Sequence, residues 1–173
     1  MARYYRKRRR TYKKNKWNIE QRASNSIANA WQTIASAGSF NKQILVPVVP
    51  ATATEGVRKV KNISISAAMQ YGGPSGTNTS AYGPIYWALI YAPEGVTINE
   101  LKTDGELYQP SNYVINSGII DNQNTAKYRI SSRLARNLKA NDRIYLLMGT
   151  NIPTNGTDLP GISWLVRYAI CFN

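Results

Sequence analysis

The segment VRKVKNISISAAMQY (residues 57–71) decides the fold, because its apolar side chains recur at every second position. The alternating residues have polar or small neighbours, and they are Ile63, Ile65, Ala67 and Met69. A period of two predicts a β-strand that buries one face and exposes the other. The same period places Arg58 on one side of this strand and Lys59 and Lys61 on the other.

Seven further segments have strand character. They are KQILVPVV (42–49), PIYWALIYA (84–92), TINEL (97–101), NYVINSGI (112–119), AKYRISSRL (126–134), DRIYLLMGT (142–150) and ISWLVRYAICF (162–172). Segment 84–92 is almost entirely apolar, which predicts a strand covered on both faces. Turn residues separate the segments, and no helices alternate with them. We therefore expect an all-β fold, an eight-stranded antiparallel jelly roll of two packed sheets.

The segment before these strands has a different period. In WNIEQRASNSIANAWQTIASAGSF (17–40), apolar residues recur at intervals of three and four, which predicts a short amphipathic helix over 18–36. The many Asn and Ser residues lower its helix propensity, so this helix would need a partner surface. The expected division is an arm with this helix over 1–41 and a β-domain over 42–173.

The chain begins with a strongly cationic arm, MARYYRKRRRTYKKNK (1–16). Residues 1–22 hold ten basic residues and one acid, a net charge of +9, whereas the other 151 residues hold twelve and eight, a net of +4. Such an arm cannot be buried, and it favours a nucleic-acid partner because cations displace the counterions of phosphates. The candidate binding residues are Arg3, Arg6, Lys7, Arg8, Arg9, Arg10, Lys13, Lys14 and Lys16.

Two further features of the arm bear on its partner. Tyr4, Tyr5 and Tyr12 lie among the cations and can stack on unpaired bases, which tilts the expectation slightly towards single strands. The unbroken basic run from Arg6 to Arg10 also fits a nuclear-localisation signal.

Two smaller basic groups lie in the β-domain. One is Arg58, Lys59 and Lys61, and the other is Arg129, Arg133, Arg136 and Lys139. Within the second group, Arg133 and Arg136 have the spacing of neighbours in a short helical turn. Solvated strand ends, a lining on the nucleic-acid side and contacts with a neighbouring subunit all remain open for these groups.

The composition argues against an enzyme. One Cys and no His leave no internal disulfide and no zinc site of the usual Cys/His type, and no phosphate-binding loop or nucleophile elbow is present. Glu94, Glu100, Asp104 and Glu106 fall in one expected loop, where a solvated loop is favoured over a glycosidase or nuclease site. We expect no catalytic residue, cofactor or metal. No stretch approaches the roughly 18 apolar residues of a membrane span, so no membrane partner is expected.

Three segments in the middle of the chain resemble a known family. YWALIYAPEG (86–95), ELYQPSNYVINSG (106–118) and YRISSRLARNLKANDRIYLL (128–147) are similar, in order and spacing, to the capsid proteins of circovirus-like small circular single-stranded DNA viruses. These viruses encode a replication initiator and one coat protein.

The resemblance implies a jelly roll whose 42–173 domain forms the shell, about sixty copies in an icosahedral particle, and an arm directed at the packaged single-stranded DNA. It also implies contact with the host nuclear import machinery, and location in the virion and the host nucleus. The main alternative from another class is a non-viral nucleic-acid-binding protein, ribosomal or chromatin-associated. The low net charge of the 151-residue body disfavours that alternative.

Overall fold

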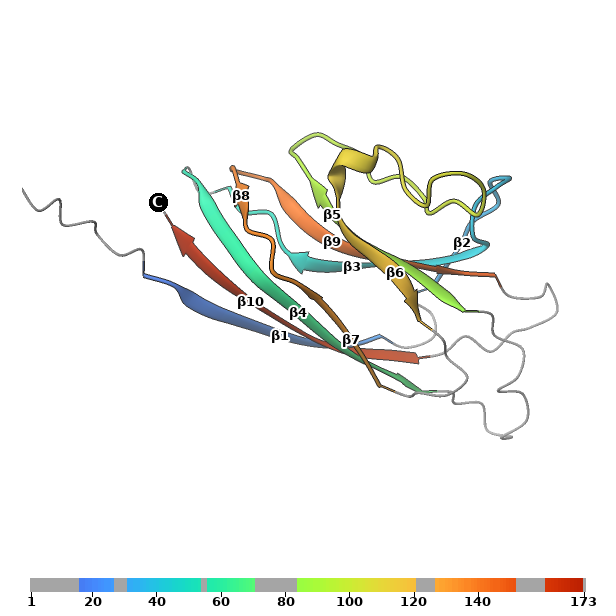
Figure 1. The fold of residues 1–173 in the computed structure, drawn as a ribbon, viewed down its shortest axis with the longest axis horizontal. Coiled ribbons are helices and arrows are strands. Elements are labelled where there is room, and N and C mark those ends of the chain that lie inside the picture. Colours follow the sequence, from blue (N-terminus) through green and yellow to red (C-terminus); the bar gives the residue numbers. More distant parts are fainter. Residues whose placement is uncertain are drawn as a thin grey trace, which may run out of the picture.

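The computed structural model describes residues 16–26, 31–53, 56–70, 84–120, 127–151 and 161–172, which form two packed antiparallel sheets (Figure 1). The first sheet consists of β1 (Asn18–Ser26), β10 (Gly161–Phe172), β4 (Arg58–Gln70) and β7 (Lys127–Ser132) in that order, with β8 (Arg136–Leu138) also paired to β4. The second sheet consists of β2 (Gln32–Thr33), β3 (Lys42–Val49), β9 (Arg143–Thr150), β5 (Ile85–Ala92) and β6 (Val114–Ile120).

The strands pair in a nested order. β1 pairs with β10, β3 with β9, β4 with β7, and β5 with β6, all antiparallel. A long hairpin folded over on itself gives this nesting, and its eight strands in two sheets are the topology of a jelly roll. The predicted eight-stranded antiparallel jelly roll is therefore confirmed, and the short strands β2 and β8 are added to it.

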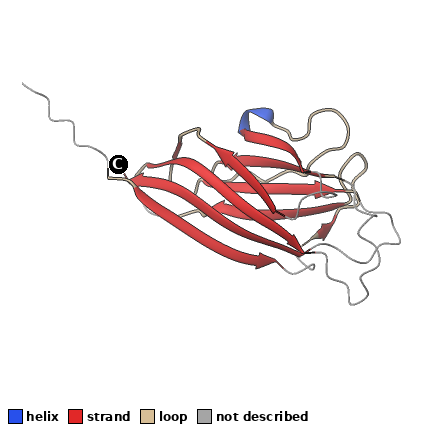
Figure 2. Cartoon of the chain, turned by 60° about the horizontal axis from the view of Figure 1, so that its bottom comes forward, coloured by secondary structure: helices blue, strands red, loops and turns tan. Residues whose placement is uncertain are grey.

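Helical structure is nearly absent from the part of the chain that the structure describes. It contains the three-residue 3-10 helix η3 (Ser111–Tyr113), which precedes β6 in the loop beside the second sheet (Figure 2). Among the described residues, no helix has the length and apolar character needed to cross a membrane.

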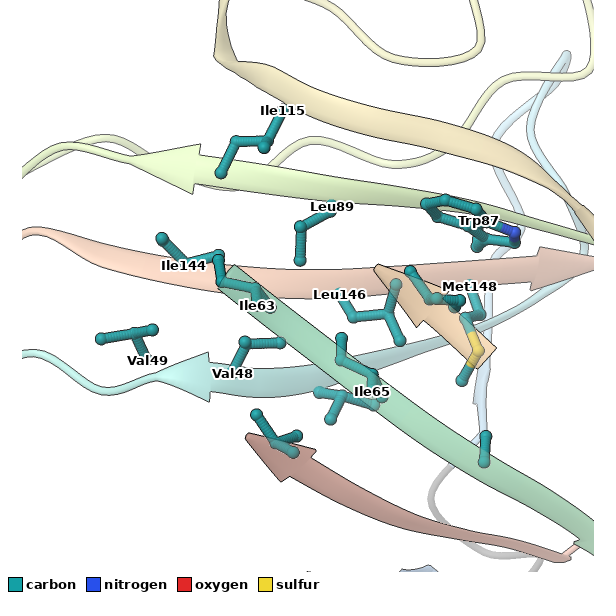
Figure 3. Packing of buried hydrophobic residues seen from close by; sticks show 14 of the residues in the cluster. Val48, Val49, Ile63, Ile65, Trp87, Leu89, Ile115, Ile144, Leu146 and Met148 are labelled. Atoms are coloured by element: carbon teal, nitrogen blue, oxygen red, sulfur yellow. The ribbon is translucent and has the colours of Figure 1, made fainter. Parts of the chain in front are cut away.

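The main core lies between the two sheets. Ile65 of β4, Leu89 of β5 and Leu146 of β9 are fully buried there, and Figure 3 shows their side chains between the strands. Their neighbours in sequence point the other way, as the period of two requires. Full burial of each such side chain stabilises the fold by about 1.5–3 kcal/mol relative to exposure.

A second core covers the outer face of the second sheet. The loop of residues 93–113 lies over this sheet, and the buried residues between them are Phe40, Ala88, Ile90, Leu101, Tyr108 and Leu147. Gln43 fastens the loop, because its Nε2 donates to the carbonyl of Leu101 (3.0 Å) and its Oε1 accepts from the amide of Leu101 (2.8 Å). β5 is thus covered on both faces, as its apolar sequence predicts.

The same loop corrects one predicted strand. Residues 97–101 form no strand but belong to the covering loop, where Leu101 is fully buried. The next residue, Lys102, makes only an isolated bridge to Ser39. Leu101 is therefore buried by packing onto the second sheet and not by membership in a sheet.

The predicted helix over 18–36 is wrong. Residues 18–26 form β1, which pairs with β10 from Asn18↔Ile170 to Ser26↔Ile162, and residues 32–33 form β2. The apolar residues that suggested the helix do not share a buried face, since Ile19 is 67% exposed and Trp31 is buried in the main core. Continuous backbone pairing with β10 outweighs the weak helix propensity. The paired β body therefore begins at Asn18, before the expected boundary at residue 42.

Four segments are joined at one end of the sandwich by Asp142. Its Oδ2 accepts hydrogen bonds from the Tyr91 hydroxyl (2.7 Å) and the Lys139 amide (2.8 Å), and its Oδ1 accepts from the Glu94 amide (3.2 Å). Arg58 donates from Nη2 to the Asp142 carbonyl (2.8 Å) and from Nη1 to the Pro50 carbonyl (3.0 Å). These bonds fix the turns that precede β4 and β9 and the turn that follows β5.

Candidate nucleic-acid interface

The outer surface of the first sheet carries cationic side chains from three strands. We call this surface the basic face and define it by Lys59 and Lys61 on β4, Lys127 and Arg129 on β7, and Arg167 on β10. Their neighbours Val60, Ile130 and Val166 are buried in the core. Because side chains alternate along a strand, these cations point away from the core.

The strand register brings the cations together on one surface. Arg129 lies opposite Ser66, Lys127 lies opposite Ala68, and Arg167 lies opposite Ser64. Directly opposite residues of antiparallel strands share a face of the sheet. The cations are therefore separated by small side chains that leave them accessible, and Lys127, Arg129 and Arg167 are exposed.

Two hollows open beside Arg129. The first, of about 510 Å³, is lined by Lys127, Arg129 and Leu165 among others. The second, of about 440 Å³, brings Arg129 together with Asn62, Ser131 and Arg133. Guanidinium, amide and hydroxyl groups are the donors with which proteins hold phosphate oxygens. Both hollows thus place hydrogen-bond donors beside Arg129.

Acidic residues lie elsewhere in the described part of the chain. Glu94, Glu100, Asp104 and Glu106 lie on the loop over the second sheet, and Asp142 is buried at the end of the sandwich. Glu20 of β1 is opposite Tyr168, whose side chain is buried, so it lies on the core side of the first sheet. Among the described residues, the outer surface of the first sheet therefore carries cations without carboxylates, whereas the surface over the second sheet carries four carboxylates together with Lys102 and Arg143.

The N-terminal arm reaches the sandwich at this basic face. Lys16 is exposed, and Trp17 follows it directly before β1. The Nζ of Lys61 lies 3.9 Å from the centroid of the Trp17 ring, a cation–π contact. Of the nine arm residues proposed to bind nucleic acid, Lys16 is described, and the other eight lie outside the described residues. Those eight are Arg3, Arg6, Lys7, Arg8, Arg9, Arg10, Lys13 and Lys14.

The basic groups picked out in the sequence separate into different roles. Lys59 and Lys61 lie on the basic face and Arg58 lies on the opposite side, as the period of two predicts. Arg58 is 3% exposed, and burial lowers the pKa of its guanidinium. Its two carbonyl contacts give it a structural role in bracing the turns.

The second basic group does not form a helical turn. Residues 133–135 have no regular structure and residues 136–138 form β8, so the helical spacing of Arg133 and Arg136 is not realised. Arg133 is exposed beside the second hollow, whereas the Arg136 guanidinium lies 5.9 Å from the centroid of the Tyr91 ring. Only Arg129 and Arg133 of this group lie at the candidate interface.

Two carboxylates of the acidic loop are engaged in hydrogen bonds. Glu100 accepts hydrogen bonds from the hydroxyls of Ser36 (3.3 Å) and Ser39 (2.9 Å), and Glu94 Oε1 accepts one from the side-chain Nδ2 of Asn141 (2.7 Å). Within the described ranges, no three residues of the metal-ligating types His, Cys, Asp and Glu come together. Glu94 and Glu100 thus link the loop to neighbouring segments.

Sequence reasoning did not single out Lys127 and Arg167. Arg167 is the sole cation of segment 162–172, and Lys127 lies two residues before Arg129 in segment 126–134. Only the pairing of β7 and β10 with β4 brings both beside Lys59 and Lys61. The sequence signal that could have found them is the alternation along each strand, which puts Lys127 and Arg167 on the face opposite to the buried Ile130 and Val166.

Comparisons with known proteins add little. No protein-family model matches the chain, and no curated protein matches it in sequence. The chain is similar to a solved structure of the Israeli acute paralysis virus full particle heated to 63 degrees, with 9% identity, a TM-score of 0.43, and coverage of 100% of this chain and 82% of that chain. It is also similar to one of desmodium yellow mottle tymovirus, with 13% identity, a TM-score of 0.39, and coverage of 92% and 90%. Both TM-scores are below 0.5, so neither likeness assigns a family or a role to this chain.

Proposed function

We propose that the chain is a viral coat protein whose sandwich builds a closed shell and whose basic arm holds nucleic acid against the basic face. One observation carries the proposal: a jelly roll presents a bare cationic surface at the point where a strongly cationic arm joins it. A cationic arm that joins the sandwich beside a face of the same sign suits a polyanion that contacts both. The proposed role is structural and binding, without catalysis, cofactor or metal.

The charge of many copies supports packaging. About sixty arms with a net charge of +9 each (60 × 9) would bring about 540 positive charges to one compartment, enough to offset several hundred phosphates. The basic face would add to this total. A container with these charges on its inner surface would concentrate nucleic acid without reading its sequence.

The proposal extends to the kind of virus. The segments that resemble circovirus-like coat proteins lie in β5, in the loop and strand leading through β6, and in β7 to β9. Together with the tyrosines of the arm, this resemblance favours a single-stranded DNA genome. The basic run from Arg6 to Arg10 would then address the host nuclear import machinery, and the protein would occur in the host nucleus and in the virion.

Particle formation and nucleic-acid content test this function together. The purified full chain is expected to form uniform particles in negative-stain micrographs, with an A260/A280 ratio that indicates nucleic acid. Deletion of residues 1–16 is expected to lower that ratio to the value of bare protein while particles persist, because the sandwich begins after the arm.

A length-matched control separates charge from chain length. A variant with all nine arm cations changed to Gln keeps the arm and removes its charge, so it should lose nucleic acid as the deletion does. Truncated particles that retain as much nucleic acid as full-length ones would exclude the arm as the packaging element. A monomer at every salt concentration that still binds nucleic acid would contradict the shell and favour the non-viral binding protein.

A further inference from the structure

β1 is a long strand whose second edge is open among the described residues. It has nine residues, and within the described ranges it pairs with β10 alone, at the margin of the first sheet (Figure 1). The side chains of residues 18–23 are exposed or half-buried, and Ile19 is 67% exposed. An open edge is a template for another strand unless proline, bulges, lysines or inward-pointing charges protect it. Neither Pro nor Lys occurs in β1, and its pairing with β10 is regular. Its two charges on the core side, Glu20 and Arg22, have opposite signs, so they disfavour an uncharged strand but suit a partner strand that supplies the complementary charges.

The sequence of β1 is complementary to itself when two copies run antiparallel. With a two-fold axis at Gln21, Glu20 of each copy lies opposite Arg22 of the other, and Ile19 lies opposite Ala23. The axis therefore creates two opposite-charge pairs flanked by two apolar pairs. Cross-strand pairs of both kinds stabilise antiparallel sheets.

Other registers are less favourable. A two-fold axis one residue earlier places two Glu20 carboxylates opposite each other, and one residue later places two Arg22 guanidinium groups opposite each other. A two-fold axis placed between two residues would put side chains that belong to opposite faces of the sheet across from each other, which breaks the hydrogen-bond ladder. The charges therefore favour the register centred on Gln21 over the registers centred on Glu20 and on Arg22.

We propose that β1 pairs with β1 of a second copy about a two-fold axis at Gln21, which joins the two first sheets into one. The partner surface is the same strand, as an isologous contact requires. This inference rests on the proposed function, because the contact would be one interface of the shell.

The contact has a consequence for the basic face. Gln21 lies opposite Arg167, which is on the basic face, so the Gln21 side chain points to that side of the sheet. Directly opposite side chains share a face, so the basic faces of both copies lie on the same side of the joined sheet. Pairing would therefore create one continuous cationic surface with twice the number of cations.

A symmetric disulfide tests the register. In Gln21→Cys the two introduced thiols face each other across the axis, at a spacing that a disulfide spans. We expect mild oxidation to give a dimer on non-reducing gels, with the 21–21 link identified by mass spectrometry. Arg22→Cys is the matched control, because its thiol would face Glu20 and should give no link. The native Cys171 is buried and is common to both variants.

Charge reversal tests the same contact without a new bond. Glu20→Arg and Arg22→Glu alone each place like charges opposite each other twice, and we expect about a tenfold weaker dimer in sedimentation at about 0.1 M salt. The double variant Glu20→Arg/Arg22→Glu should restore dimerisation. Glu106→Arg, on the exposed acidic loop, makes the same charge change as Glu20→Arg and should have no effect.

The outcomes distinguish this contact from the shell. Particles in which the Cys at position 21 stays unlinked, or in which Arg22→Cys links instead, overturn the pairing at Gln21 and leave the proposed coat function standing. Linked dimers that never form particles support the pairing and contradict the shell. Double reversal without rescue, in variants that retain the wild-type melting temperature, also overturns the pairing.

Discussion

At the scale of single residues, Asp142 shows how a buried charge is stabilised here. It is 3% exposed, and burial alone would raise the pKa of its carboxyl. The hydrogen bonds from Tyr91 and from the amides of Lys139 and Glu94 outweigh burial and leave that pKa below its ordinary value. The same contact, after burial itself, raises the pKa of Tyr91 to about 12. The carboxylate is thus held charged by three donors, two from the end of β5 and the turn after it and one from the turn before β9.

Asp142→Asn should destabilise the fold by about 1–3 kcal/mol, because an amide cannot accept from all three donors and at least one buried donor loses its partner. Chemical denaturation at pH 7 would measure the change. Glu106→Gln is the matched control, since this exposed carboxylate should alter the unfolding free energy by less than about 0.5 kcal/mol. Equal effects of both substitutions would contradict the role of Asp142.

The pH dependence of that difference follows from the lowered pKa of Asp142. A carboxyl with a lowered pKa in the folded state contributes stability that is complete above its ordinary value, near 3.8, and is lost as pH falls through the lower folded value. The difference between the wild-type protein and Asp142→Asn should therefore stay constant from pH 7 to about pH 5 and shrink below about pH 4. A difference that grows on acidification would contradict this.

At the scale of elements, burial decided which strands could be predicted. Segment 84–92 is apolar because both its faces are covered, and β4 alternates because one face is bare. β1 gives no such signal, since its described side chains lie at the surface and its pairing is made by the backbone. Residues 97–101 gave a false signal, because Leu101 is buried by packing onto a sheet. The structure has eight main strands, as predicted, but β1 takes the place of the strand that was predicted over residues 97–101.

The candidate interface was predictable only in part for a related reason. Period two assigns each cation to a face of its own strand, which separated Arg58 from Lys59 and Lys61. It cannot show which strands are neighbours, so the grouping with Lys127 and Arg167 required the register of the sheet.

Removing cations from the basic face should weaken nucleic-acid binding in a salt-dependent way. We expect Arg129→Gln/Arg167→Gln to reduce the slope of log K against log salt by about 1.4 for single-stranded DNA, if each side chain neutralises one phosphate. Fluorescence anisotropy of the full-length protein would measure it. Lys102→Gln/Lys139→Gln removes the same charge away from this face and is the control. Equal slopes for the two double variants would exclude the face from binding.

At the scale of the whole molecule, the two outer surfaces of the sandwich are electrostatically unlike. The first sheet carries the basic face, and the loop over the second sheet carries Glu94, Glu100, Asp104 and Glu106. The covering loop also adds a layer over the second sheet, with an apolar core of its own. In a shell built from such units, we expect every copy to be oriented the same way, because the basic face has cations without carboxylates among the described residues and should attract a polyanion more strongly than the loop-covered surface.

This orientation predicts which lysines nucleic acid protects in particles. Lys59, Lys61 and Lys127 lie on the basic face, whereas Lys102 and Lys139 do not, so amine acetylation read by mass spectrometry can compare the two sets. Removing the nucleic acid should speed acetylation of the first set and leave the second set unchanged, because bound phosphates cover the amines of the first set. Each lysine serves as its own control before and after removal. Equal changes at Lys102 and Lys127 would show that nucleic acid does not contact the first sheet, and the basic face would then be free for contacts with protein.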